Sequence, residues 1–69
     1  MVAMLTWQDP EDLGRELAVS YPDKDPLAVS RAEVRRLVAA LPGFGDDPAA
    51  ASEQDLEEVQ AAWYDAVQE

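Results

Sequence analysis

Neither cysteine nor histidine occurs among the 69 residues, so an apolar core alone has to hold the fold together. A chain of this length forms one domain, and its core contributes about 3–5 kcal/mol unless a disulfide or a metal adds to it. The same absence excludes a persulfide relay, a cysteine-ligated cluster, a serine-histidine triad and the nitrogen or sulfur ligands that zinc and copper prefer. Carboxylate oxygen is the ligand type that is left for a metal ion.

Acidic residues outnumber basic ones by 15 to 5, which gives a formal charge of −10 at neutral pH. Nucleic acid and anionic lipid are bound through clustered lysine and arginine, so this charge opposes both and favours a basic partner or a cation. With 48% hydrophobic residues the chain is too apolar for a disordered acidic tail, and we expect a folded domain. The apolar opening, residues 1–5, is short and lacks a basic start, so it fits neither a signal peptide nor a membrane span. We expect a cytoplasmic protein, and a monomer.

Aspartate, proline and glycine divide the chain into helical stretches. Asp9-Pro10 starts the first, because the aspartate side chain can cap free backbone N–H groups and proline costs nothing at the first helical position. Tyr21-Pro22 ends it, since the residue before a proline avoids the helical region. Leu13 and Leu17 share one face of this helix, and Gly14 permits another backbone to come close.

A second aspartate-proline start, Asp25-Pro26, predicts a short helix of one turn, and Ser30 then opens a capping box with Glu33 for a longer helix. Pro42-Gly43 ends that longer helix. Two helices joined this tightly resemble a helix-turn-helix corner. The apolar residues of the longer helix recur at helical spacing and predict its buried face: Val34, Leu37, Val38 and Leu41.

The last helix follows a loop with an acidic turn. Phe44 is the apolar anchor that we expect for this loop, which turns at Asp46-Asp47-Pro48. Ser52 opens the helix, with an aspartate three residues later at the capping-box distance. The apolar positions of this helix keep a helical period: Leu56, Val59, Trp63 and Ala66 or Val67. No stretch alternates like a strand, so the sequence predicts one mainly α-helical domain over residues 1–69, in which residues 1–6 form a flexible N-terminal segment.

Two runs, Tyr21 to Pro26 and Phe44 to Pro48, stand in register with Trp7 and Trp63 in a short, strongly acidic chain. This pattern resembles, without gaps from Thr6 to about Ala66, the IscX family of small acidic iron-sulfur assembly proteins. The resemblance implies a mostly helical fold related to the winged helix and a role as adaptor and regulator in iron-sulfur cluster assembly. It also implies a cysteine desulfurase as partner and weak binding of ferrous or ferric iron through surface carboxylates, with no tightly bound cofactor.

Three carboxylates at the start of the first helix are the candidate metal ligands. Asp9, Asp12 and Glu16 are three and four residues apart, so they can share one helical face on which a hard cation could bridge two of them. The plainer interpretation is a solvated helix start, where acidic side chains cap the helix and complement its dipole. Carboxylates alone discriminate poorly between iron and magnesium, calcium or manganese, so we expect a weak site.

Two acidic turns supply candidate contacts to a basic partner: Asp23 and Asp25 in one, Asp46 and Asp47 in the other. Asp25 also fits the N-cap of the short helix, and Asp46 and Asp47 also fit an ordinary turn. A calcium loop starting at Asp23 is excluded, because Pro26 stands where further ligands are needed.

The remaining marked residues predict structure rather than chemistry. Arg31, Arg35 and Arg36 form a basic cluster, which we interpret as ion-pair partners of nearby carboxylates and not as a nucleic-acid surface. Trp7 and Trp63 are expected in the core, where they hold the first and last helices together. No constellation supports catalysis, because a small helical domain has little volume for a cleft, and we expect no enzyme.

Charge and resemblance together predict an adaptor or regulator that docks on a cysteine desulfurase through its acidic surface. The alternatives are an iron donor or chaperone for cluster assembly, and a generic acidic protein-interaction module.

Overall fold

Three α-helices and one short 3₁₀ turn make up the computed structural model, which describes residues 4–68. The elements follow one another as α1 (Pro10–Ser20), α2 (Arg31–Ala39), η1 (Pro48–Ala50) and α3 (Glu53–Gln68). The described part of the chain contains no strand, and a single parallel bridge joins Leu5 to Phe44. The prediction of a mainly α-helical domain is confirmed in that respect.

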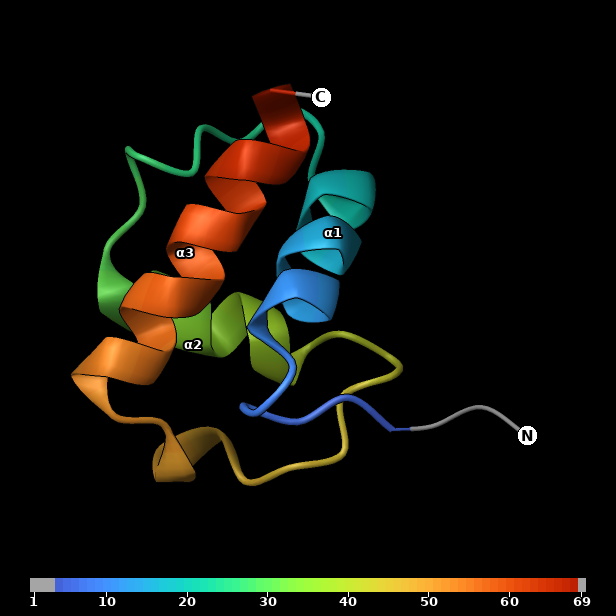
Figure 1. The fold of residues 1–69 in the computed structure, drawn as a ribbon, viewed down its shortest axis with the longest axis vertical. Coiled ribbons are helices and arrows are strands. Elements are labelled where there is room, and N and C mark those ends of the chain that lie inside the picture. The colour runs from blue at the N-terminus through green and yellow to red at the C-terminus, as the bar shows by residue number, and fades with distance from the viewer. Residues whose placement is uncertain (1–3, 69) are drawn as a thin grey trace.

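Helices α1 and α3 lie side by side and run in the same direction, while α2 crosses near their starts (Figure 1). The two helices come close together at Gly14 of α1. A Cβ atom built on Gly14 would lie 2.5 Å from the backbone nitrogen of Trp63 and 2.6 Å from the carbonyl carbon of Ala62. Only glycine allows the two backbones to meet at this distance, so the predicted role of Gly14 is confirmed.

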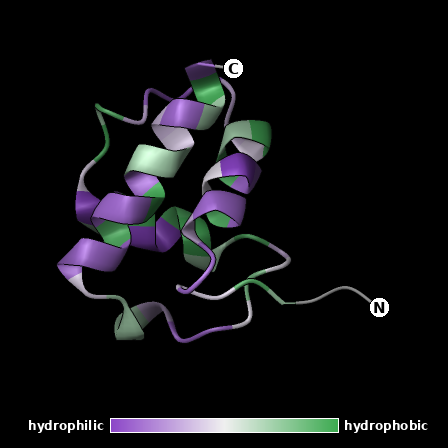
Figure 2. Ribbon diagram, viewed as in Figure 1, coloured by the Kyte–Doolittle hydropathy of each residue, from purple (hydrophilic) through white to green (hydrophobic). Residues whose placement is uncertain are grey.

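The core is formed by the apolar faces of the three helices and by Trp7, which precedes them. Trp7 is 3% exposed and Trp63 is fully buried, so both tryptophans are core residues as predicted. Figure 2 shows short hydrophobic and hydrophilic stretches alternating along α1 and α3, as amphipathic helices require. The other buried apolar residues include all the predicted stripe positions from Leu13 to Val59: Leu13, Leu17, Val34, Leu37, Val38, Leu41, Leu56 and Val59.

Two of the predicted helix caps are present. The hydroxyl oxygen of Ser30 accepts a hydrogen bond from the backbone N–H of Glu33 at 3.2 Å and starts α2. Ser52 and Asp55 form the reciprocal capping box of α3, because each backbone N–H donates to the side chain of the other, at 3.0 and 3.1 Å. Local sequence signals therefore set the starts of α2 and α3.

The predicted side-chain cap at Asp9 is wrong. Asp9 occupies the N-cap position of α1, but its carboxylate makes no hydrogen bond to the helix. Instead, Oδ2 of Asp9 accepts hydrogen bonds from the backbone N–H of Thr6 at 3.2 Å and from its hydroxyl at 3.3 Å. The carboxylate closes the turn that carries Trp7, and this local partner competes with the helix for it.

The predicted short helix after Asp25 is wrong, because residues 26–28 form a hydrogen-bonded turn and no helix lies between α1 and α2. Oδ1 of Asp25 accepts from the backbone N–H of Leu27 at 3.0 Å, and its carbonyl oxygen accepts from the N–H of Ala28 at 2.9 Å. Asp25 therefore caps the turn as predicted. Ser30 already starts α2 five residues later, which leaves no room for a second turn.

The predicted flexible segment, residues 1–6, falls partly outside the described residues, because these begin at residue 4. Within the described part, the backbone N–H of Leu5 donates to the carbonyl oxygen of Gly43 at 2.8 Å. The N–H of Gly45 in turn donates to the carbonyl oxygen of Leu5 at 2.8 Å. These two bonds connect the start of the described chain to the loop before η1. No helix in this part of the chain is both long and apolar enough to cross a bilayer.

Candidate functional site

Two of the three predicted metal ligands, Asp9 and Asp12, line one hollow of about 280 Å³ at the start of α1, and Glu16 does not line it. Asp9 directs its carboxylate to Thr6. Asp12 lies 3.4 Å from Nη1 of Arg15, which is a weak ion pair between exposed groups. Glu16 is exposed on the next turn. Among the described residues, no group of three or more acidic side chains is placed to hold a metal ion, so α1 does not contain a preformed metal centre.

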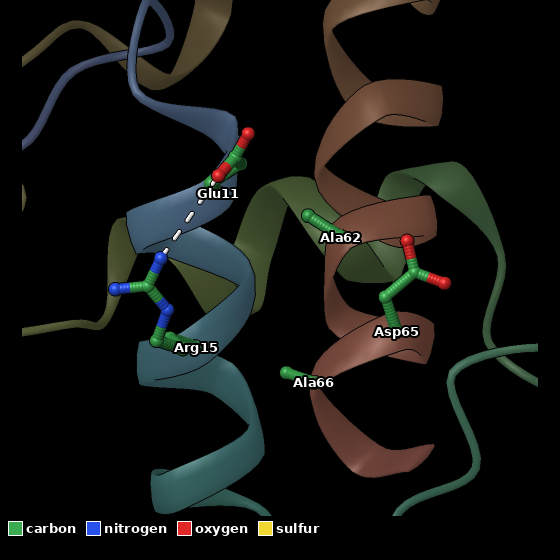
Figure 3. A pocket seen from close by; sticks show the side chains of 5 residues that line it. All are labelled: Glu11, Arg15, Ala62, Asp65 and Ala66. Carbon is green, nitrogen blue, oxygen red and sulfur yellow. Dashed lines mark ion pairs between the residues drawn. The ribbon is translucent and has the colours of Figure 1, made fainter. Parts of the chain in front are cut away.

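A hollow of about 260 Å³ lies between α1 and α3, lined by Glu11, Arg15, Ala62, Asp65 and Ala66 (Figure 3). Ala62 and Ala66 point toward α1, whereas the carboxylate of Asp65 points away from it. Arg15 also lies 4.0 Å from Glu11 on the same helix. The two charged groups of α1 thus pair with each other, and the hollow gathers no set of polar groups aimed at a ligand.

The acidic turn at Asp46 and Asp47 is built into the fold. Oδ2 of Asp46 accepts from the backbone N–H of Trp7 at 3.4 Å, and Oδ1 accepts from the N–H of Asp47 at 2.7 Å. Oδ1 of Asp47 caps η1 by accepting from the N–H of Ala49 at 2.9 Å. These carboxylates satisfy backbone donors within the chain, which favours the turn interpretation of the sequence.

Trp7 joins this turn to the core. Its indole Nε1 donates to the carbonyl oxygen of Asp47 at 2.8 Å. Its ring meets the ring of Phe44 edge-on, with centroids 5.0 Å apart and planes at 68°. Phe44 is therefore the apolar anchor of its loop, as predicted.

The other acidic turn, at Asp23 and Asp25, lies at the opposite end of the molecule. The loop between α1 and α2 starts at the C-terminal end of α1, whereas the loop that leads to η1 runs past the N-terminal ends of α1 and α3 (Figure 1). Asp23 is exposed, and the adjacent Lys24 pairs with Glu33 at 3.8 Å instead. The four predicted partner contacts thus fall into two separate pairs.

Beside the turn at Asp25 lies a hollow of about 300 Å³ that the sequence did not indicate. Leu27 and Tyr64 are exposed apolar residues on its two sides, at 67% and 37% exposure. The positions of Leu27 and Tyr64 in the sequence could have indicated this hollow. Leu27 lies outside the apolar stripes of the helices, and Tyr64 stands one residue after a position of the buried stripe of α3. Its lining combines apolar, amide and charged side chains: Leu27, Arg31, Glu57, Gln60, Ala61, Tyr64 and Asp65.

The predicted basic cluster is used within the chain. Arg31 pairs with Glu57 at 3.2 Å, and Arg36 pairs with Glu33 on its own helix. Arg35 donates through Nη2 to the carbonyl oxygen of Ala51 at 3.2 Å, so its partner is a backbone group rather than the predicted carboxylate. This arrangement agrees with an internal role for the three arginines.

Residues 5–68 match the family model described as iron-sulphur cluster assembly. The chain is also 42% identical over 59 residues to a protein of Pseudomonas aeruginosa that is named only as uncharacterized. That alignment covers 86% of this chain and 89% of the relative. The match to the family model includes the two acidic turns and all three helices.

Proposed function

The chain belongs to the iron-sulphur cluster assembly family, the IscX family, and on that premise we propose that it regulates a cysteine desulfurase by docking on it. The match to the family model over residues 5–68 is the observation that carries this proposal. Membership gives the chain a role in iron-sulfur cluster assembly. The proposal adds the partner, the acidic mode of docking and the regulatory effect.

The charge of the folded chain supports a basic partner. All five basic side chains already have an acceptor within the chain, which they contact in these pairs: Arg15 with Asp12, Lys24 with Glu33, Arg31 with Glu57, Arg35 with Ala51, and Arg36 with Glu33. Each of these basic side chains thus has an acceptor close by, and the net charge of the chain is −10. Such a field accelerates encounter with a basic surface, and salt weakens it.

The amino-acid composition favours a protein that acts by docking on its partner and carries out no reaction itself. A chain without cysteine cannot receive the persulfide sulfur that a desulfurase produces. We infer that it acts by occupying the desulfurase surface and slowing the delivery of sulfur. The proposed role is regulatory and not enzymatic. We propose the cytoplasm as the compartment in which the chain acts.

Calorimetry with the desulfurase of the same cell at low ionic strength tests the proposal. We expect binding whose affinity falls as salt is added, and a lower rate of sulfide release from cysteine when the chain is bound. A variant with Glu53→Gln, on the exposed start of α3, controls for the loss of a single charge. Absence of binding at low ionic strength would show that the proposed partner is wrong.

Iron handling is the second candidate, because Asp12 and Glu16 are exposed one turn apart on α1. Binding there requires Asp12 to leave Arg15 and Asp9 to leave Thr6, so we expect it to be weak. Titration of ferrous ion without oxygen, followed by amide resonances, decides this point. Unchanged resonances over residues 9–16 at millimolar iron would rule out this site.

Two finer expectations from the resemblance also stay proposals. A relation to the winged helix is one of them, and the three helices are compatible with it. A generic acidic interaction module is the remaining alternative for function. A gene neighbourhood without any desulfurase or cluster scaffold would favour that alternative.

A further inference from the structure

An apolar patch is exposed at the hollow between the turn at residues 25–29 and α3. Leu27 is 67% exposed on the turn, and Tyr64 lines the facing side on α3, with Ala61 one turn before it. In a chain with a core as small as this one, leaving a leucine in solvent forgoes about 1.5–3 kcal/mol of burial. We call Leu27, Ala61 and Tyr64 the apolar patch.

Hydrogen bonds hold Leu27 in this outward position. The side-chain amide of Gln60 donates from Nε2 to the carbonyl oxygens of Pro26 at 2.5 Å and Val29 at 3.1 Å. Asp25 accepts from the N–H of Leu27 itself. Pro26 is buried, so the turn is anchored on both sides of Leu27. The patch is therefore preorganised, which reduces the ordering that a partner would otherwise have to impose.

The hollow beside the apolar patch is lined by two carboxylates, Glu57 and Asp65, and by one cation, Arg31. Glu57 on its rim is paired with Arg31, but the carboxylate of Asp65 points away from α1 and its arginine (Figure 3). Asp23 is exposed on the same loop as Leu27. A second copy of the chain would bring −10 against −10, and an anionic lipid surface would be repelled as well. The rim favours an occupant that carries lysine or arginine.

We infer that the apolar patch is the anchor point of docking: it receives one large apolar side chain of the partner, flanked by basic residues. A volume of about 300 Å³ suits one such side chain. This inference rests on the proposed function, in which the partner is a cysteine desulfurase. The carboxylates raise the rate of association, and the apolar contact lowers the rate of dissociation.

The test compares Leu27→Ser with Val19→Ser in binding to the desulfurase. Val19 is 76% exposed on α1 and does not line the hollow, so it is a matched loss of an exposed apolar side chain. We expect Leu27→Ser to weaken binding about tenfold, mainly through faster dissociation, and Val19→Ser to leave it unchanged. Tyr64→Ser is expected to act like Leu27→Ser. Urea unfolding of each variant checks that the fold is retained.

A separate variant tests the rim. Asp65→Asn is expected to slow association two- to threefold at low salt and to leave dissociation unchanged. This split between the two rates distinguishes the rim from the apolar patch.

The outcomes distinguish a failure of this inference from a failure of the proposed function. If the wild-type chain does not bind the desulfurase, the proposed function fails and this inference fails with it. If the wild type binds and Leu27→Ser binds equally well, the inference alone is overturned. If sedimentation shows a dimer that Leu27→Ser dissociates, the occupant is a second copy and the inference is again overturned.

Discussion

Two loops of this chain carry the same sequence signal, aspartates followed by a proline, and use it in opposite ways. In the loop that leads to η1, the carboxylates of Asp46 and Asp47 accept hydrogen bonds from backbone N–H groups, one of them that of Trp7. In the loop between α1 and α2, Asp25 caps its turn, but Asp23 and the adjacent apolar patch face solvent. One loop stabilises the fold, and we propose that the other is presented to a partner.

The two loops show that the acidic residues of this chain are of two kinds, those that accept hydrogen bonds from the backbone and those that have no partner within the described residues. A carboxylate that accepts from the backbone contributes to stability, and its removal leaves a donor without a partner. A carboxylate without an internal partner adds only repulsion to the folded state, so its use has to lie elsewhere. By this criterion Asp9, Asp46 and Asp47 are structural, and we propose Asp23 and Asp65 as docking charges.

The largest expected effect is on the structural loop. Trp7→Ala removes a buried indole together with its hydrogen bond to Asp47 and its contact with Phe44. We expect a loss of about 3–5 kcal/mol, which is as much as a core of this size contributes and leaves the chain largely unfolded. Urea or thermal unfolding followed by circular dichroism measures it, with Tyr64→Ala as the exposed aromatic control. A folded Trp7→Ala variant with an unchanged midpoint would contradict the account.

Asp46→Ala is expected to have the second-largest effect on stability. It leaves the N–H groups of Trp7 and Asp47 without their acceptor, and we expect a loss of about 1–2 kcal/mol in the free energy of unfolding. Binding to the desulfurase at fixed salt is expected to change only as any single charge would change it. If Asp46→Ala instead abolishes docking in a fully stable chain, the two loops have been assigned the wrong way round.

Gln60→Ala tests the docking loop without touching a charge. It removes both hydrogen bonds that fasten the turn to α3, and we expect about 1 kcal/mol of destabilisation. Amide exchange is expected to speed up over residues 26–29 and to stay unchanged over residues 42–47. Gln54→Ala is the matched control, since Gln54 lies exposed on the same helix and contacts only Glu58 at 3.5 Å. Equal exchange in both variants would show that Gln60 does not hold the turn.

The smallest expected effect on stability is that of Asp23→Asn. The side chain is exposed and has no ion-pair partner in the described part of the chain, so we expect a change within about 0.5 kcal/mol. Association with the desulfurase is expected to slow two- to threefold at low salt, and the difference to vanish at high salt. Stopped-flow kinetics at two salt concentrations measures both, and a loss of stability above 1 kcal/mol would place Asp23 with the structural carboxylates.

Much of the fold follows from local sequence signals. The serines that start α2 and α3, the proline-containing ends and the apolar stripes act over three or four residues, so they can be read directly. Gly14 could be read as well, because few reasons other than a close backbone explain a glycine within a helix. The side chain of Asp9 could not, since Thr6 and the helix compete for it at the same sequence distance.

The candidate site was harder to predict because it depends on contacts between distant residues. Gln60 holds a turn that lies 31 and 34 residues away in sequence, and nothing in its local pattern signals that contact. Trp7 likewise reaches Asp47 across 40 residues. The sequence offered both acidic turns as candidate contacts to a partner, with an ordinary turn as the other interpretation of Asp46 and Asp47. The tertiary contacts favour that other interpretation for these two residues.

Hydrogen exchange of the chain with and without the desulfurase tests the central claim most directly, because it observes both loops in one experiment. We predict added protection over residues 23–31 and 57–65, where the apolar patch and its rim lie, and unchanged exchange over residues 42–47. Protection confined to residues 42–47, with none at the turn that carries Leu27, would contradict the assignment of the two loops.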